Sequence, residues 1–347
     1  MKEMNRKLSL YKFLSSVKLF LLASQRKRHG EVPRAIFLHS LFRSGSTYLF
    51  KKFRETDRFW CYYEPFHHEL LRLKKDNLAL FRFDKEATGR MNHPGLEKPH
   101  FYEYSVAMGD DDRLPFFNTL LAYDEFASVK HQACTFKYVL NLIDSVPDNS
   151  IPFLQFNRSS LRIHWFKKYF PNSFHAYLLR APRDQFESYC LAGKHSNNIF
   201  LAINLYIILK NYNFWFFREV YDDIKGINPL SGNIFKDLDR CINHVNSFSY
   251  ALHYKIFLHL WIASLVEGSK SADVIIDMNK LGKSEAYSTD IANLFSDNFS
   301  MPINFFNDAN IKCYDSFILD SEEYEKIEHQ LSNLYGRILK EIDFRFQ

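Results

Sequence analysis

The chain has 347 residues, of which 46% are hydrophobic and only 11 are glycine and 11 proline, so it is long enough to bury a large core and has few obvious linkers. Its 45 basic and 40 acidic residues leave a net charge of +5, a mild excess that argues against nucleic acid as a partner and suits a small anionic ligand. The 5 cysteines are scattered without a C-x-x-C pair, which suggests neither a disulfide framework nor a zinc site and favours a reducing, cytoplasmic compartment.

The N-terminal segment is the one candidate for targeting. Residues 8–22 are rich in leucine and phenylalanine, but Lys12 and Lys18 interrupt them and the basic run 26–28 follows. A membrane-spanning helix needs roughly 20 mainly apolar residues, and a cleavable signal needs an unbroken apolar region. We interpret residues 1–30 as an amphipathic helix with a basic segment, packed on the rest of the chain. Peripheral contact with a membrane surface is the alternative, and it stays open.

Apolar runs alternate with helical patterns along the remaining chain, residues 31–347, which we treat as a single domain. We expect strands at 34–40, 59–63, 152–156, 175–179 and 273–278. Helices are expected from Thr47, after a cap at Ser159 or Ser160, from Asp184, and over 245–266. Alternating strands and helices predict an α/β fold with a central parallel sheet covered by helices on both faces.

Residues 67–133 lack clear periodicity and are too many for a plain loop. We interpret them as a partly helical elaboration over the edge of the sheet where an acceptor would bind. A surface insertion without a role is the alternative.

The first motif follows the first strand, at residues 41–47, and reads Leu-Phe-Arg-Ser-Gly-Ser-Thr. It differs from the nucleoside triphosphate P-loop because Gly45 is followed by Ser46 rather than by lysine. Backbone N–H groups at the start of the next helix can surround an anion, and Arg43 can donate two parallel hydrogen bonds to it. Alone, such a string is more often an ordinary helix-capping turn.

The second motif follows the strand at 175–179. Arg180 ends that strand, and Ser188 lies about two helical turns into the next helix. Two strand–turn–helix sites, each with an arginine at the strand end, predict a ligand with two separate anionic groups.

Together the two motifs resemble the signatures of the sulfotransferases that use 3′-phosphoadenylyl sulfate (PAPS). The Arg-Ser-Gly start is closer to the carbohydrate and tyrosylprotein branches than to the cytosolic branch. The resemblance covers roughly residues 34–193 and the late strand near Asp273. It implies a P-loop-like phosphate-binding loop after the first strand, with the 5′-phosphosulfate held by Arg43, Ser44, Gly45, Ser46 and Thr47, and the 3′-phosphate by Arg180 and Ser188. No counterpart of the C-terminal Arg-Lys-Gly signature of the cytosolic branch is present.

Sulfuryl transfer depends on positioning and on charge stabilisation. Arg43 is the first candidate for stabilising the transferring group and Arg158 the second. An acceptor hydroxyl also needs a base, for which Glu64 is the candidate and His67 the reserve; a surface ion pair is the alternative role for Glu64 and for Arg158.

The sequence therefore predicts a metal-independent sulfotransferase with PAPS as donor, PAP as product and a hydroxyl or amine acceptor, with a carbohydrate favoured. A P-loop-type kinase or nucleotide phosphotransferase and a non-catalytic nucleotide-binding protein are the alternatives. The oligomeric state is not indicated.

Overall fold

The computed structural model describes residues 35–81, 96–123, 125, 132–194, 198–224, 226–227, 230–300, 303–305, 314 and 318–342. The expected helix within residues 1–30 lies outside these ranges. Among the helices that are described, none has the length and apolar character needed to cross a bilayer.

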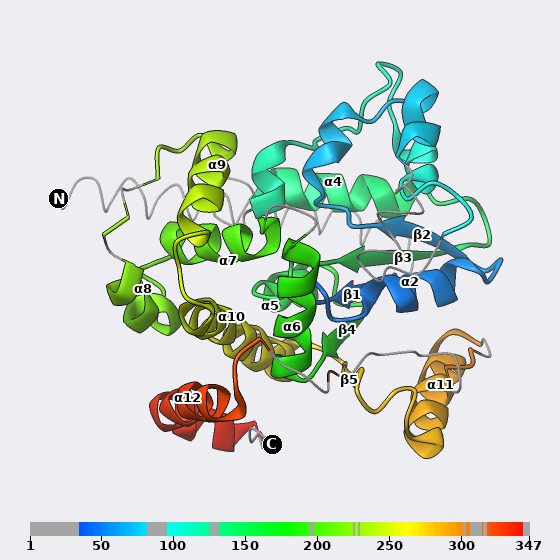
Figure 1. Ribbon diagram of the computed structural model, residues 1–347. Helices are drawn as coiled ribbons and strands as arrows, with labels where there is room; N and C mark the ends of the chain where they lie inside the picture. Colours follow the sequence, from blue (N-terminus) through cyan, green and yellow to red (C-terminus); the bar gives the residue numbers. More distant parts are fainter. Residues whose placement is uncertain are drawn as a thin grey trace, which may run out of the picture.

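A five-stranded, all-parallel sheet forms the centre of the structure (Figure 1), with strand order β2-β3-β1-β4-β5. In chain order the strands are β1 (Ile36–His39), β2 (Phe59–Tyr63), β3 (Ile151–Phe156), β4 (Phe174–Leu179) and β5 (Val274–Asp277). Each strand was predicted to within two residues, and the parallel arrangement is confirmed. Because all strands run the same way, their carboxyl ends meet at one edge, and β1 lies between β3 and β4.

Helices flank the sheet on both faces, as predicted. Within the described residues the α-helices are α2 (Ser46–Arg54), α4 (Gln132–Asp144), α5 (Ile163–Tyr169), α6 (Pro182–Gly193), α7 (Ile199–Lys210), α8 (Arg218–Ile224), α9 (Ile234–Val245), α10 (Tyr250–Ser271), α11 (Glu285–Phe299) and α12 (Ser321–Glu341). Short 3₁₀ helices are η1 (His68–Arg72), η2 (Lys75–Leu80), η3 (Tyr102–Ala107), η4 (Thr119–Tyr123) and η5 (Trp215–Phe217).

One face of the sheet is covered by α2 and α11. The ring of Phe53 on α2 stacks on Phe153 of β3 at 4.3 Å between centroids and meets Phe295 of α11 edge-on at 4.9 Å. As predicted, Leu49, Phe50 and Phe53 are fully buried. This apolar contact fixes α2, and with it the loop that precedes α2, against the sheet.

The other face is covered by α4, α5 and α10. Phe37 of β1 packs on Phe166 of α5 at 5.4 Å. The hydroxyl of Tyr177 on β4 lies 2.8 Å from that of Ser264 on α10. Two buried histidines lie in this aromatic layer, where His39 Nε2 is 3.2 Å from His175 Nδ1.

The helices expected from Thr47, after Ser159 or Ser160, and from Asp184 are present, but their starts differ by one to three residues, and α2 begins at Ser46. The helix after β3 begins at Ile163 with Arg162 as its N-cap, because the Ser159 hydroxyl is hydrogen-bonded to His39 instead. Helix α6 begins at Pro182 rather than at Asp184, since proline favours the first helical position.

The expected long helix over 245–266 is α10, which begins at Tyr250 and continues to Ser271. Its expected start lies too early because α9 ends at Val245 and the chain turns before α10 begins. Ser249 is the N-cap of α10, and its hydroxyl accepts a hydrogen bond from the Leu252 N–H at 3.2 Å, which marks the boundary.

The region 67–133 is partly helical, as expected. Its described parts contain η1 to η4 and the start of α4, while residues 82–95, 124 and 126–131 lie outside the described ranges. The Tyr104 hydroxyl on η3 donates to the Tyr63 carbonyl at 2.9 Å. The region therefore packs beside the carboxyl end of β2.

Candidate functional site

Polar side chains follow four neighbouring strands at the carboxyl edge of the sheet. Arg43 lies in the loop after β1, Glu64 directly follows β2, Arg158 lies two residues after β3, and Arg180 directly follows β4. In open parallel sheets, ligands bind at this edge, where neighbouring connections leave in opposite directions along the sheet. Here that point lies between β1 and β4, since β1 connects toward β2 and β4 connects toward β5.

The loop after β1 has an unusual backbone. Arg43 and Gly45 have positive φ angles of 60° and 98°, and only Gly45 adopts this region without steric cost. Gly45 is the N-cap of α2 and supplies no side-chain hydrogen bond to it. The first N–H groups of a helix have no partner within the helix, so the start of α2 has the donor arrangement typical of an anion site.

Ser44 adds a second sign of an anion site. Its side chain is 1% exposed, and no hydrogen-bond partner of its hydroxyl is found within the described part of the chain. A buried hydroxyl without a partner is unfavourable by roughly 1–3 kcal/mol. A ligand that accepts a hydrogen bond from Ser44 would remove this cost.

The structure brings the two predicted anion sites into direct contact. Arg43 Nε donates to the Ser188 hydroxyl at 2.9 Å, and Arg180 Nη1 donates to the Arg43 carbonyl at 2.9 Å. Arg180 and Ser188 are buried, and Arg43 is partly buried. The Trp261 indole donates to the Arg180 carbonyl at 3.1 Å and holds that end of β4 against α10.

The charges of this cluster favour an anion. Burial lowers the pKa of Arg43, and the neighbouring Arg180 lowers this pKa further. Two guanidinium groups brought together in a poorly solvated place repel each other. A bound phosphate or sulfate would replace this repulsion by charge-assisted hydrogen bonds.

Glu64 lies in a separate polar cluster at the ends of β2 and β3. It is 7% exposed and has a positive φ of 41°, a conformation that costs energy for a residue other than glycine. One carboxylate oxygen forms an ion pair with Arg158, and the other accepts a hydrogen bond from Asn157 Nδ2 at 2.8 Å. The carboxylate is therefore held in one orientation, and lone pairs remain on both oxygens.

Asn157 connects the Glu64 carboxylate to Ser46 at the start of α2. Its Oδ1 accepts hydrogen bonds from the hydroxyls of Ser40 and Ser46 at 2.7 and 2.9 Å and from Gln155 Nε2 at 2.9 Å. The sequence analysis did not assign Asn157 or Gln155 to the site. Their position at the end of a predicted strand was the available signal.

Thr47 and His67 border these two clusters. The Thr47 hydroxyl lies 3.4 Å from that of Tyr63. Burial is the main reason that the pKa of His67 lies well below its usual value, with Arg158 nearby as a further cause. His67 Nδ1 accepts from the Glu69 N–H at 3.2 Å, so in the neutral ring we assign the proton to Nε2. Nε2 then carries the proton and the lone pair of Nδ1 is used, so neither nitrogen can take a proton from an acceptor. Of the two candidate bases, Glu64 is therefore favoured over His67.

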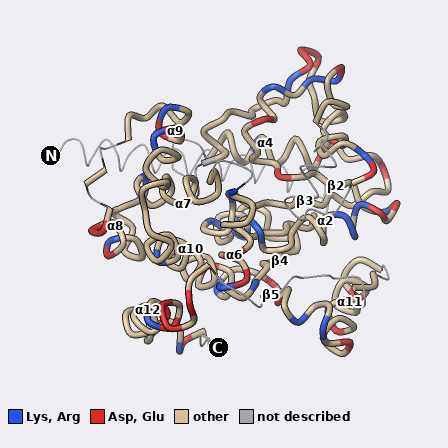
Figure 2. Tube along the Cα trace, viewed as in Figure 1, with Lys and Arg blue, Asp and Glu red and all other residues tan. Residues whose placement is uncertain are grey.

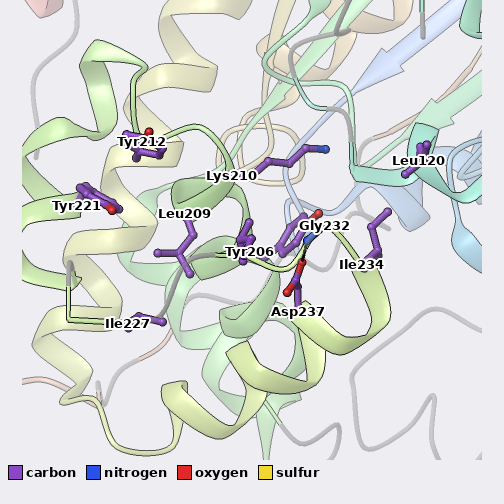
Figure 3. Close-up of a pocket in the computed structure, with 11 residues that line it drawn as sticks. Leu120, Tyr206, Leu209, Lys210, Tyr212, Tyr221, Ile227, Gly232, Ile234 and Asp237 are labelled. Carbon is purple, nitrogen blue, oxygen red and sulfur yellow. Dashed lines mark hydrogen bonds between the residues drawn. The ribbon is translucent and has the colours of Figure 1, made fainter. Parts of the chain in front are cut away.

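A cavity of about 420 Å³ lies elsewhere, among η4, α7, α8 and α9 (Figure 3). Tyrosine and aliphatic side chains dominate its lining, with Lys210 and Asp237 as charged members. The Asp237 carboxylate accepts hydrogen bonds from the Ser231 and Gly232 N–H groups at 2.8 and 2.9 Å. None of the site residues expected from the sequence lines this cavity.

Charges of both signs are interspersed along the chain (Figure 2), so the candidate anion site is a local feature and not part of a one-signed field. The described residues contain no group of three or more His, Cys, Asp or Glu side chains placed to hold a metal ion.

The comparisons with known proteins add no assignment. No family model, no curated protein and no solved structure matches this chain.

Proposed function

We propose that the protein is a sulfotransferase that moves a sulfuryl group from PAPS to a hydroxyl or amine of an acceptor, with a carbohydrate-containing acceptor favoured. The observation that carries this proposal is the joining of two anion-site motifs by the Arg43–Ser188 and Arg180–Arg43 hydrogen bonds. A donor with a 5′-phosphosulfate and a 3′-phosphate has two anionic groups on one ribose, which suits two adjacent sites.

The residues fit the two anionic groups of the donor. Ser44, Gly45, Ser46 and Thr47 at the start of α2 would hold the phosphosulfate, in a P-loop-like role, together with Arg43. Arg180 and Ser188 would hold the 3′-phosphate. Ser188 accepts its hydrogen bond from Arg43, so its own hydroxyl hydrogen can be donated to a phosphate oxygen.

In the reaction, the acceptor oxygen forms a bond to sulfur while the bond from sulfur to the phosphate oxygen breaks. Glu64 would take the proton of the acceptor hydroxyl, since that hydroxyl is a poor nucleophile at neutral pH. Arg43 would stabilise the negative charge that develops on the leaving phosphate oxygen, which ends on PAP. Arg158 would act mainly by orienting Glu64, with which it is paired.

The link between Glu64 and the loop supports an enzyme over a binding protein. Asn157 contacts the Glu64 carboxylate at 2.8 Å and the Ser46 hydroxyl at 2.9 Å, so one side chain connects the proposed base and the start of α2. A buried and oriented carboxylate beside the anion site is what removal of a proton from an acceptor requires.

The test is transfer of radiolabelled sulfate from PAPS to a panel of oligosaccharide, phenol and amine acceptors, with and without EDTA. We expect labelled product that EDTA does not abolish. Phosphoryl transfer from ATP that requires Mg²⁺ would replace this proposal by the kinase alternative. Tight PAP binding without transfer to any acceptor would leave a nucleotide-binding protein.

A further inference from the structure

The amide of Asn157 contacts residues from several elements of the candidate site. It lies one residue beyond β3 and is 7% exposed. Its partners come from the end of β1, from α2, from β3 and from the end of β2. It therefore joins three neighbouring strands and the first turn of α2 at their common edge.

The orientation of this amide is determined by its partners. The Glu64 carboxylate, when ionised, can only accept hydrogen bonds, so the atom that faces it must be Nδ2. The opposite side then presents Oδ1 to Ser40, Ser46 and Gln155. A flipped amide would place oxygen against carboxylate and NH₂ against the Gln155 NH₂, and is excluded on both sides.

Asn157 Oδ1 has two lone pairs, but three hydrogen-bond donors lie within reach of it. Ser40 Oγ and Gln155 Nε2 lie at 2.7 and 2.9 Å from Oδ1 and belong to the strand ends. Ser46 Oγ, at 2.9 Å, belongs to the first turn of α2. The Ser46 hydroxyl can rotate toward an anion while Gln155 Nε2 and the Ser40 hydroxyl, whose one hydrogen is shared with the Phe156 carbonyl at 3.1 Å, still hold the amide. Occupying the anion site therefore leaves the contact to Glu64 in place.

We propose that Asn157 is the positioning residue of this site: it fixes the Glu64 carboxylate for proton transfer, and it holds the Ser46 hydroxyl in a hydrogen bond that bound PAPS can replace. The inference rests on the proposed function. Asn157 contacts Glu64 and Ser46 and acts through them, so its loss changes the rate of transfer more than the binding of the donor.

The test compares wild type with Asn157→Asp, which keeps the shape and the oxygen that faces Ser46 but places a second carboxylate against Glu64. We expect kcat to fall roughly 10²-fold, as for a misplaced catalytic group, and by a larger factor than the affinity for PAP, which the added negative charge beside Ser46 also lowers. The acidic limb of the kcat–pH profile should move up by roughly one unit or more, because a neighbouring carboxylate disfavours ionisation of Glu64.

Asn141→Asp is the matched control. Asn141 lies on α4, away from the strand ends, and its amide donates to the Ala107 carbonyl at 2.9 Å. Its replacement should leave kcat and the pH profile unchanged. An Asn157→Asp enzyme with a wild-type pH profile, even with a lower melting temperature, would overturn the inference and reduce Asn157 to a structural role.

Two outcomes separate this inference from the proposed function. If wild type neither binds PAP nor transfers sulfate, the proposed function fails and the inference falls with it. If wild type is active but the pH profile of Asn157→Asp equals that of wild type, the inference alone fails.

A second test needs no donor. Urea unfolding gives the free energy of coupling between Ser46→Ala and Glu64→Gln in a double-mutant cycle, measured once with Asn157 present and once in the Asn157→Ala background. We expect coupling with Asn157 present that disappears in Asn157→Ala. Absence of coupling in both backgrounds would contradict the link.

Discussion

The carboxyl edge of the sheet and its α2–α11 face are built from opposite kinds of buried side chain. At the edge, Glu64, Arg158 and Arg180 are charged and at most 7% exposed. On the face, Phe53, Phe153 and Phe295 are fully buried rings, and Phe53 contacts both of the others. The same helix, α2, belongs to both regions, with its first turn at the edge and its later residues on the face.

The two regions are expected to contribute to different properties of the protein, the face to folding stability and the edge to ligand binding and turnover. Buried apolar rings contribute directly to folding, by about 1.5–3 kcal/mol for each side chain. A buried ion pair contributes little net stability because the loss of hydration offsets the attraction of its charges. Changes on the face should therefore alter unfolding with little effect on ligand binding. Changes at the edge should alter ligand binding and turnover, with an added loss of stability where a buried charge loses its partner.

The largest expected effect is that of Glu64→Gln on turnover. The amide keeps the shape but cannot take up the acceptor proton, so turnover should fall by roughly 10²–10⁴-fold with PAP affinity nearly unchanged. Rates of labelled sulfate transfer and calorimetric PAP binding measure the two effects. Because this substitution leaves Arg158 without its ionic partner, thermal unfolding is followed in parallel.

Glu103→Gln is the control for that loss of charge. Glu103 is also buried and paired to an arginine, Arg54, at 2.7 Å, but it lies on η3. It should lower stability as Glu64→Gln does and leave turnover unchanged. If both variants lost turnover equally, we would attribute the loss in Glu64→Gln to reduced folding stability and not to the missing base.

On the apolar face, Phe53→Ala should destabilise the protein by about 3–5 kcal/mol, since a ring in contact with Phe153 and Phe295 leaves a cavity. Urea unfolding measures this. The remaining folded protein should keep its preference for PAP over adenosine 5′-phosphate. A loss of that preference would show that the packing of α2 on the face also determines ligand binding at the edge.

Arg180→Ala tests the second anion site. PAP should stabilise wild type against heat much more than adenosine 5′-phosphate does, because only PAP has the 3′-phosphate. The substitution should remove roughly 1.5–3 kcal/mol of PAP binding, the range for a hydrogen bond to a charged group. Arg183→Ala, which breaks an ion pair to Glu328 on α12 at 2.6 Å, should keep the preference. Equal stabilisation of wild type by both ligands would contradict the assignment of Arg180 and Ser188.

The buried histidines give the smallest effect, on stability against pH. Burial lowers the pKa of His175 to about 4 and that of His39 well below its usual value. The unfolded chain then binds more protons, so stability is fully present above about pH 6.5 and falls as the pH drops toward 4. His175 alone should contribute a loss of about 2 kcal/mol at pH 5.

Urea unfolding at pH 7.5 and pH 5 measures this loss. His175→Phe keeps a ring in the aromatic layer and should reduce the difference in stability between the two pH values, even where its stability at pH 7.5 is lower. An unchanged difference would assign the acid sensitivity to other groups.

Much of the fold could be predicted because its signals are local. The apolar runs of β1 and β4 and the buried stripe Leu49, Phe50, Phe53 each lie within a few consecutive residues. Helix α7 was not predicted because its sequence is apolar on all sides and nearly every residue is buried, which leaves no periodic pattern to detect. The cap at Ser159 was wrong because that hydroxyl bonds to His39, 120 residues away.

The sequence by itself determined the strands, the amphipathic α2 and the two Arg-containing turns, since period and turn chemistry act between neighbours in the chain. Only the tertiary structure decided which groups meet at the edge. Arg43 and Ser188 are 145 residues apart, and Glu64 and Asn157 are 93 apart. Their contacts depend on the strand order β2-β3-β1-β4-β5, which brings the carboxyl ends of β1, β2, β3 and β4 together because all strands are parallel.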